Sequence, residues 1–341
     1  MAYCLMNRIR KGEIHTKLVI CGNGLDLHVG FKTGYRNYRD YLANDRLTHG
    51  GRAIPIIEES DFFKTRKGDC WSDLEQSLTF DGKKYIDALV YAYDRDIDPN
   101  SADNSHNQIK VANEVQKKDP KDIAFQFTND WFYEWLLNEY YGREEEVRNN
   151  YHGIVRDITS CPDNLYITFN YTPTLESIFG VDEDHILYIH NRFPYKPKLP
   201  FSSDDLLNDI FESGEKRFQF GSINNQIDEW IKYLKSIELK SNGKLMQLSQ
   251  VEKDLQHIGW AFSKNLKCNY ATMKSFLKEA LIDEIVIIGH SFLGVDEQYY
   301  RDILVPMYKY KKWTFYYYQS DEMARNFIDK YGINEFDLVA I

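Results

Sequence analysis

The pattern of apolar and polar positions along the chain predicts a sheet of buried strands. Five short runs consist almost entirely of aliphatic, β-branched or aromatic residues, which is typical of strands covered on both faces. Helical patterns separate several of these runs, and this alternation indicates a doubly wound, parallel α/β sheet. The predicted strands are residues 18–21, 165–169, 186–189, 284–288 and 313–318, and the predicted helices are residues 35–43, 71–93, 123–148, 269–281, 296–308 and 321–330.

The interval between the first two predicted strands is too long for a single crossover. Because its pattern is mostly helical, we expect residues 54–160 to form a large helical insertion. The core of the protein is then expected to comprise residues 17–53 and 161–341. Residues 98–122 and 191–218 are polar or proline-rich and are expected to be loops, the second of which follows a strand and could cover a ligand.

Composition and charge narrow the class of protein. The 341 residues are 43% hydrophobic and 28% charged, as in an ordinary globular protein. The net charge of −10 argues against direct nucleic-acid binding through a broad basic surface. No apolar run has the length of a membrane span, and the N-terminal residues lack the order of charges typical of a secretory signal. We therefore expect no association with a membrane.

The cysteines indicate neither a zinc site nor a disulfide framework. There are five of them, an odd number, and no two are spaced as C-x-x-C. A reducing compartment suits this usage, so a cytoplasmic location is expected.

The most informative segment is the glycine turn after the first predicted strand, Gly22-Asn23-Gly24. A strand that turns through glycines into a helix is a common way to hold nucleotide phosphates, because backbone N–H groups can approach the anion. The segment departs from the dinucleotide pattern G-x-G-x-x-G, since Leu27 takes the third glycine position and the next glycine is Gly30. A tight strand–helix connection without a ligand is the alternative interpretation.

Three further strands are followed at once by compact polar motifs. These motifs begin at Asn170, at His190 and at Gly289, and the last one extends through Ser291 to Asp296. In a parallel sheet the carboxyl ends of all strands lie at one edge, which is where open α/β sheets bind ligands. The four motifs therefore predict a binding site at that edge.

Each of these residues also has a structural interpretation. Asn170 could cap the helix that follows it, and His190 could be a hydrogen-bonded core histidine. Asp26 could stabilise the first turn of its helix, and Ser291 and Asp296 could be loop and cap residues.

Taken in order, the motifs resemble the AbiH family of bacteriophage abortive infection proteins. The resemblance spans almost the whole chain and implies a single AbiH-like domain, residues 1–341, with a role in phage defence. The motifs that carry it are Leu18-Val-Ile-Cys-Gly-Asn-Gly-Leu-Asp-Leu-His28 with Gly30, Trp71-Ser-Asp-Leu-Glu75, Thr168-Phe-Asn-Tyr-Thr172 with Leu175-Glu176, Ile189-His190, and Ile288-Gly-His-Ser-Phe-Leu-Gly294 with Asp296 and Tyr299.

More distantly, the same motifs resemble the Rossmann-like, sirtuin-like fold of NAD-binding proteins. This resemblance implies that Gly22, Asn23 and Gly24 approach a pyrophosphate and that Ser291 contacts the adenosine end of NAD. It implies two catalytic residues: Asn170, which positions a ribose or a water, and His190, which acts as the general base. The remaining ligand-binding residues expected in this site are Asp26, Gly30, Gly289 and Asp296.

The sequence departs from the sirtuin-like pattern at two positions. Asn191 takes the place of the glycine that usually follows the histidine, and Thr172 takes the place of an acidic residue. The zinc ribbon of protein-deacetylating sirtuins has no counterpart, because the chain lacks paired C-x-x-C motifs.

The resemblances together imply a phage-defence effector that binds and hydrolyses NAD or a related nucleotide when triggered. The alternative is a sensor module that binds a nucleotide or ADP-ribose without turnover. A nuclease-like toxin is a third interpretation, and the acidic net charge weighs against it. The expected partners are the nucleotide itself and a phage-derived trigger or partner subunit. A second copy of the chain, in a homo-oligomer, is a further candidate partner. No metal is expected.

Overall fold

A computed structural model describes residues 16–44, 63–65, 78–96, 120–155, 159, 161–192, 218–219, 226–240, 248–292 and 294–341. The chain divides into two compact units. The first, here the sheet unit, comprises Met1–Thr33, Leu136–Asp209 and Asn265–Ile341, and the second, here the helical unit, comprises Gly34–Trp135 and Ile210–Lys264. The division predicted from the sequence, with a core of residues 17–53 and 161–341 and an insertion of residues 54–160, stays a prediction.

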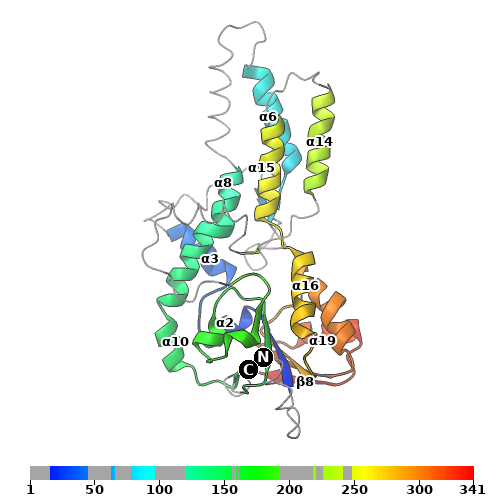
Figure 1. Cartoon of the computed structure of the whole chain (residues 1–341). Helices are drawn as coiled ribbons and strands as arrows, with labels where there is room; N and C mark the ends of the chain where they lie inside the picture. Colours follow the sequence, from blue (N-terminus) through cyan, green and yellow to red (C-terminus); the bar gives the residue numbers. More distant parts are fainter. Residues whose placement is uncertain are drawn as a thin grey trace. The chain divides into compact units, whose positions relative to one another are not determined.

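The sheet unit is built on six parallel strands in the order β5-β4-β1-β6-β7-β8. Five of them confirm the strands predicted from the apolar runs, and with them the Rossmann-like α/β fold. The sixth, β8, was not predicted (Figure 1). The strands are β1 (Thr16–Cys21), β4 (Leu165–Thr168), β5 (Ile186–Tyr188), β6 (Ile282–Ile288), β7 (Lys312–Tyr317) and β8 (Phe336–Ala340).

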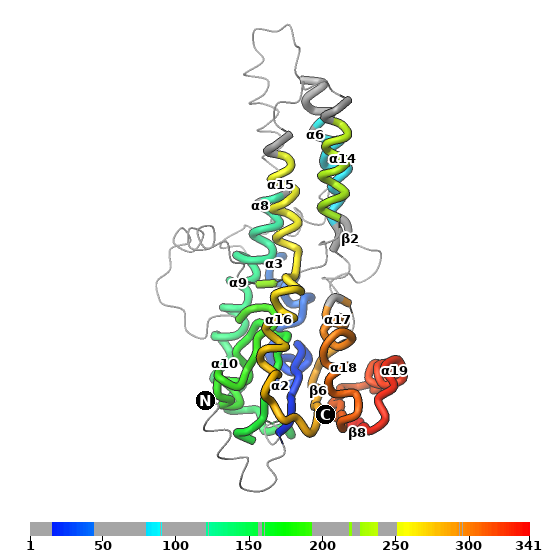
Figure 2. The backbone as a smooth tube through the Cα atoms, turned by 45° about the vertical axis from the view of Figure 1, so that its right-hand side comes forward, coloured from blue at the N-terminus to red at the C-terminus, as the bar shows by residue number. Residues whose placement is uncertain are grey.

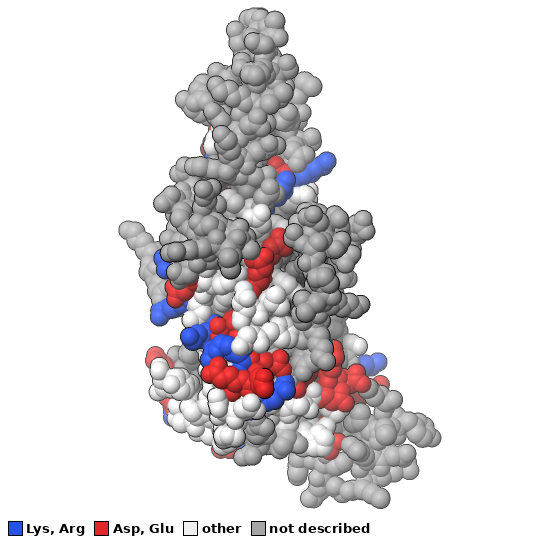
Figure 3. Space-filling view, turned by 90° about the vertical axis from the view of Figure 1, so that its left-hand side faces the viewer, with Lys and Arg blue, Asp and Glu red and all other residues white. Residues whose placement is uncertain are grey.

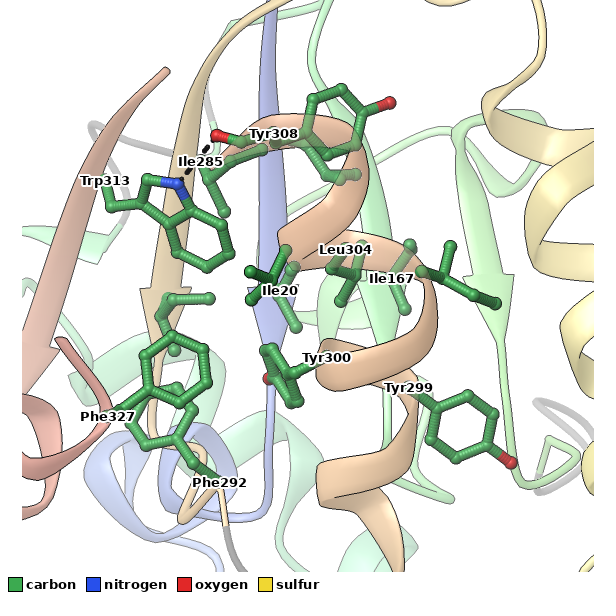
Figure 4. Close-up of a cluster of buried hydrophobic side chains, with 14 of the residues drawn as sticks. Ile20, Ile167, Ile285, Phe292, Tyr299, Tyr300, Leu304, Tyr308, Trp313 and Phe327 are labelled. Carbon is green, nitrogen blue, oxygen red and sulfur yellow. Dashed lines mark hydrogen bonds between the residues drawn. The ribbon is translucent and has the colours of Figure 1, made fainter. Parts of the chain in front are cut away.

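Side chains of the central strands alternate between two cores. In β1, Leu18 and Ile20 belong to one hydrophobic cluster, whereas Val19 and Cys21 belong to another. The first cluster includes Trp313, whose indole Nε1 donates a hydrogen bond of 3.0 Å to the carbonyl oxygen of Tyr308 (Figure 4). Both faces of the sheet are therefore covered, which explains why its strands read as continuous apolar runs.

Different helices cover the two faces. The cluster of Leu18 and Ile20 takes side chains from α16, α19 and the helical stretch that begins at α17, and the cluster of Val19 and Cys21 takes them from α2 and α10 (Figure 2). The helical elements of this unit are α2 (Gly24–Val29), η2 (Leu137–Tyr141), α10 (Glu144–Asn150), α12 (Thr174–Ser177), η3 (Glu183–His185), α16 (Leu266–Leu277), η4 (Gly294–Asp296), α17 (Glu297–Tyr299), η5 (Tyr300–Leu304), α18 (Val305–Tyr308) and α19 (Glu322–Tyr331).

The helical unit packs α15 against both α14 and α8, and α14 against α6. Aromatic residues fill its interior, and the ring of Tyr38 contacts those of Phe127, Phe132 and Trp135. Its helices α14 and α15 and its two-stranded antiparallel ladder, β2–β3, were not predicted. Its elements are α3 (Tyr35–Asn44), β2 (Phe63–Thr65), β3 (Leu78–Phe80), α6 (Gly82–Asp96), α8 (Pro120–Phe125), η1 (Gln126–Asp130), α9 (Trp131–Leu136), which ends just past the unit boundary, α14 (Ile227–Lys240) and α15 (Leu248–Ala261).

The predicted helices at 35–43, 269–281, 296–308 and 321–330 are confirmed to within a few residues. The predicted helix at 123–148 is an almost continuous series of α and π segments over residues 120–150. The predicted helix at 71–93 is wrong at residues 78–80, which form β3, and is confirmed from residue 82 onward by α6. Residues 71–77 and most of both predicted loops lie outside the described residues. Within the described ranges, no helix combines the length and the apolar character needed to cross a bilayer.

Candidate functional site

The four polar motifs lie at the carboxyl ends of four neighbouring parallel strands, β5, β4, β1 and β6. The backbone pairing of the sheet continues into the first residues of the motifs. Phe169 N–H donates to Cys21 O at 2.9 Å, and Ile189 N–H donates to Thr168 O at 3.0 Å. Asn170 and His190 therefore lie at the same end of the sheet, as the sequence predicted.

The glycines of the β1–α2 turn allow a close contact between two backbone segments. Gly22 N–H donates to Ile288 O at 3.0 Å, and Gly24 N–H donates to Gly289 O at 2.8 Å. A Cβ atom on Gly24 would lie 2.6 Å from Gly289 Cα, so only glycine fits. The glycine pattern thus has a structural cause in the approach of the β6 loop, and these two amides already have acceptors within the protein.

Asn23 and Gly30 fix the two ends of α2. The Asn23 side chain is exposed and pairs with Thr33, donating from Nδ2 to Thr33 O at 3.0 Å and accepting from Thr33 Oγ1 at 2.7 Å. Gly30 ends the helix with a φ of +112°, a left-handed conformation that favours glycine. Both residues were predicted to bind the ligand, and each has a place in the local fold.

The Asp26 carboxylate is buried at the centre of a polar network. Its Oδ1 accepts hydrogen bonds from Asn170 Nδ2 at 3.1 Å and from Thr174 Oγ1 at 2.7 Å, and its Oδ2 accepts one from Thr172 Oγ1. Burial raises the pKa of Asp26 to about 6, although the hydrogen bonds from the threonines and Asn170 oppose this shift. Asp26 therefore ties α2 to the segment that follows β4.

Asn170 does not cap the helix that follows it. The N-cap of α12 is Pro173, and the Asn170 side chain turns to Asp26 instead. The amide oxygen of Asn170 is buried and accepts no hydrogen bond from the described residues. A buried acceptor of this kind requires an explanation, because almost all buried polar groups in proteins are paired.

His190 faces Asp296 across the ends of β5 and β6. The distance from His190 Nε2 to Asp296 Oδ1 is 3.1 Å, although the ring N–H is not aligned for a hydrogen bond. His190 is only 2% exposed and lies among the rings of Phe169, Tyr171 and Tyr299. Two residues predicted separately from the sequence, as base and as ligand-binding residue, thus form a pair.

The β6 loop bends sharply to bring these groups together. Gly289 and Phe292 both have positive φ angles, of +63° and +56°. The loop is held by a hydrogen bond of 3.0 Å from Phe292 N–H to His290 Nδ1. Ser291, predicted to contact the adenosine end of NAD, is exposed on this loop.

Several neighbouring residues were not predicted as site residues. Thr172 and Thr174 donate to Asp26. Thr172 ends the family motif Thr168–Thr172, whereas the only signal for Thr174 in the sequence is its spacing after Asn170. Glu176 forms an ion pair with Arg192 at 3.3 Å and accepts a hydrogen bond from the Tyr188 hydroxyl. Burial raises the pKa of Glu176 even though both hydrogen bonding and the Arg192 charge oppose it. Trp71-Ser-Asp-Leu-Glu75, a motif of the family resemblance, lies outside the described residues.

Two remaining features of the described residues are their surface charges and their metal-ligand side chains. Figure 3 shows the Lys and Arg side chains of one face as separate groups beside Asp and Glu side chains. Arg143, at the start of α10, forms ion pairs with Glu139 and Glu146. In the part of the chain that the structure describes, no three His, Cys, Asp or Glu side chains gather as metal ligands.

The fold and the site define a Rossmann-like α/β protein whose polar residues meet at the carboxyl edge of its sheet. Comparison with known families finds the model of the bacteriophage abortive infection protein AbiH, which matches residues 18–317. The chain belongs to the AbiH family, and its role is in bacteriophage abortive infection. No curated protein matches the chain. The resemblance to sirtuin-like proteins stays a prediction.

Proposed function

We propose that this protein binds NAD or a related nucleotide at the carboxyl edge of its sheet and hydrolyses it when phage infection triggers the protein. The observation that carries the proposal is the presence of two polar pairs at the strand ends where such folds take ligands: the buried pair of Asn170 with Asp26, and the pair of buried His190 with partly exposed Asp296. The family membership supplies the biological setting, and the sirtuin-like resemblance supplies the substrate class.

His190 is the proposed general base. Because its Nε2 faces the Asp296 carboxylate, Nδ1 is the nitrogen that remains to accept a proton. A carboxylate beside one ring nitrogen favours the tautomer with its proton on that nitrogen. No metal is required for this chemistry.

The proposed reaction is the hydrolysis of the bond between nicotinamide and ribose. This bond breaks with its electron pair leaving on the nicotinamide nitrogen, and a water oxygen bonds to the ribose carbon. The proton of that water passes to His190 and from there to solvent. Asn170 orients the ribose or the water. A general base contributes about 10²–10⁴-fold to the rate of such a step.

The proposal rests on residues that would contact the ribose of the nucleotide, and not on the glycine turn that was predicted to contact its phosphates. The amides of Gly22 and Gly24 donate to Ile288 and Gly289, so they are not the donors on which this proposal rests. A pyrophosphate contact by this turn stays a prediction.

The test is the NAD content of phage-infected cells that carry each variant. NAD should fall in cells with the wild-type protein but not in cells with His190→Ala, while His152→Ala, a change of an exposed histidine, behaves as wild type. Infected cells contain the trigger, so the assay in cells does not depend on whether the purified protein is active without it. Purified protein with NAD then gives the rate, measured as free nicotinamide by chromatography. Wild-type protection with NAD unchanged in these cells contradicts the proposal.

The burial of His190 favours a second candidate, a sensor that binds without turnover. A side chain only 2% exposed can shape a pocket while few of its atoms reach a ligand. In that case ADP-ribose binds to the purified protein in a calorimetric titration, and no nicotinamide is released in infected cells.

A further inference from the structure

The network around Asp26 determines which end of the Asn170 amide faces a ligand. An ionised carboxylate can only accept hydrogen bonds, and Asp26 receives three of them from side chains that follow β4. The hydroxyl group of each of the two threonine donors can both donate and accept a hydrogen bond. The amide of Asn170, in contrast, has a donor end and an acceptor end, and the carboxylate is compatible only with the donor end.

The opposite end of the amide has no such partner. Asn170 Oδ1 is buried and accepts no hydrogen bond within the described residues, whereas Nδ2 lies 3.1 Å from Asp26 Oδ1. The backbone at this position is also fixed, because Asn170 N–H donates to Thr168 Oγ1 at 3.1 Å. A flipped amide would set an oxygen against the carboxylate and forfeit a buried, charge-assisted hydrogen bond.

We propose that Asp26 is a positioning residue that holds the Asn170 amide so that its carbonyl oxygen, and not its NH2 group, faces the substrate. The inference rests on the proposed function. Asp26 was predicted to bind the ligand, whereas in this inference it contacts Asn170 and acts on the ligand only through that side chain. The group that this carbonyl oxygen contacts must then be a hydrogen-bond donor, which in a nucleotide site is a ribose hydroxyl or the attacking water and not a phosphate oxygen.

A double-mutant cycle tests the inference. The variants are Asp26→Ala, Asn170→Ala and both together, with Asp329→Asn, an exposed change on α19, as the control. Asp26→Ala should lower kcat about tenfold or more per folded molecule, because the amide then turns freely. In the Asn170→Ala background the same change should have no further effect on kcat, since Asp26 acts through Asn170. Equal effects in both backgrounds, or an unchanged kcat in Asp26→Ala, overturn the inference.

The exchange variant, Asp26→Asn with Asn170→Asp, covers the case in which Asp26→Ala fails to fold. It reverses donor and acceptor across the same hydrogen bond and leaves an acceptor oxygen at position 170. Its kcat should exceed that of Asn170→Ala at least tenfold, and a kcat no higher than that of Asn170→Ala overturns the inference. If only kcat falls in Asp26→Ala, the donor is the water, and if KM for NAD rises as well, the donor is a ribose hydroxyl.

The same variants measured by phage plating separate this inference from the proposed function. If the wild-type protein protects cells but NAD does not fall, the proposed function fails. The cycle is then scored by the efficiency of plating. Loss of protection in Asp26→Ala with restoration by the exchange variant supports the link between Asp26 and Asn170, and loss of protection in both variants overturns it.

Discussion

Replacing Asp26 with asparagine should remove a specific part of the pH dependence of stability. Burial raises the pKa of this carboxyl group from 3.8 to about 6. A group whose pKa is higher in the folded than in the unfolded state contributes stability below its unfolded pKa, and this contribution is lost as the pH rises through the folded pKa. Asparagine is neutral at every pH and shows no such change.

The magnitude follows from the size of the pKa shift. One pKa unit corresponds to about 1.4 kcal/mol, so a rise from 3.8 to about 6 corresponds to about 3 kcal/mol. The free energy of unfolding of the wild type, minus that of Asp26→Asn, should therefore fall by about 3 kcal/mol between about pH 3 and pH 8. The fall should be centred between pH 4 and pH 6, where the folded and unfolded proteins differ most in bound protons.

Urea unfolding followed by circular dichroism at half-unit steps of pH measures this difference. Asp329→Asn, an exposed aspartate in the same unit, is the matched control and should give a difference that is flat with pH. A difference for Asp26→Asn that is flat within about 0.5 kcal/mol, or that grows as the pH rises, would refute the argument that desolvation dominates over the three hydrogen bonds.

Two further substitutions test the packing that supports the site. Gly24→Ala should destabilise the protein by about 3 kcal/mol in thermal unfolding, because the new Cβ would lie 2.6 Å from Gly289 Cα. Gly180→Ala is the control, because nothing lies within 4 Å of its new Cβ. It should cost only about 1 kcal/mol, which is the cost of its positive φ. Equal losses would show that the close approach of the two loops is wrong. Trp313→Ala should cost about 4 kcal/mol in urea unfolding, because it empties a fully buried site and leaves the Tyr308 carbonyl without its indole donor, and a loss below about 1 kcal/mol would contradict the described core.

The sequence by itself determined the elements whose signal is local. Strands such as β1 and β6 are covered on both faces, so they appear as unbroken apolar runs and were predicted to within two residues. The ends of these strands were also visible, because glycine, asparagine and histidine follow the apolar runs at once. The family could be identified from the same motifs in order, and the match over residues 18–317 confirms it.

Elements with one exposed side escaped prediction. The edge strand β8 alternates little between apolar and polar residues, and Phe336 and Asp337 at its start are exposed. The helices α14 and α15 carry charged residues between their apolar positions, and their pattern becomes clear only when each has a neighbouring helix to cover its apolar side.

Only the tertiary structure decided which polar side chains meet. Asp26 and Asn170 are 144 residues apart in the chain, and they come together because β1 and β4 are neighbours in the sheet. Strand order depends on how all the helices pack, and a hydrophobic pattern along one strand does not specify which strand lies beside it. The pairing of His190 with Asp296 has the same origin, since it requires the β6 loop to bend toward the end of β5. The sequence thus determined which residues stand at the strand ends, and the packing of the sheet decided that an aspartate supports each of the two proposed catalytic side chains.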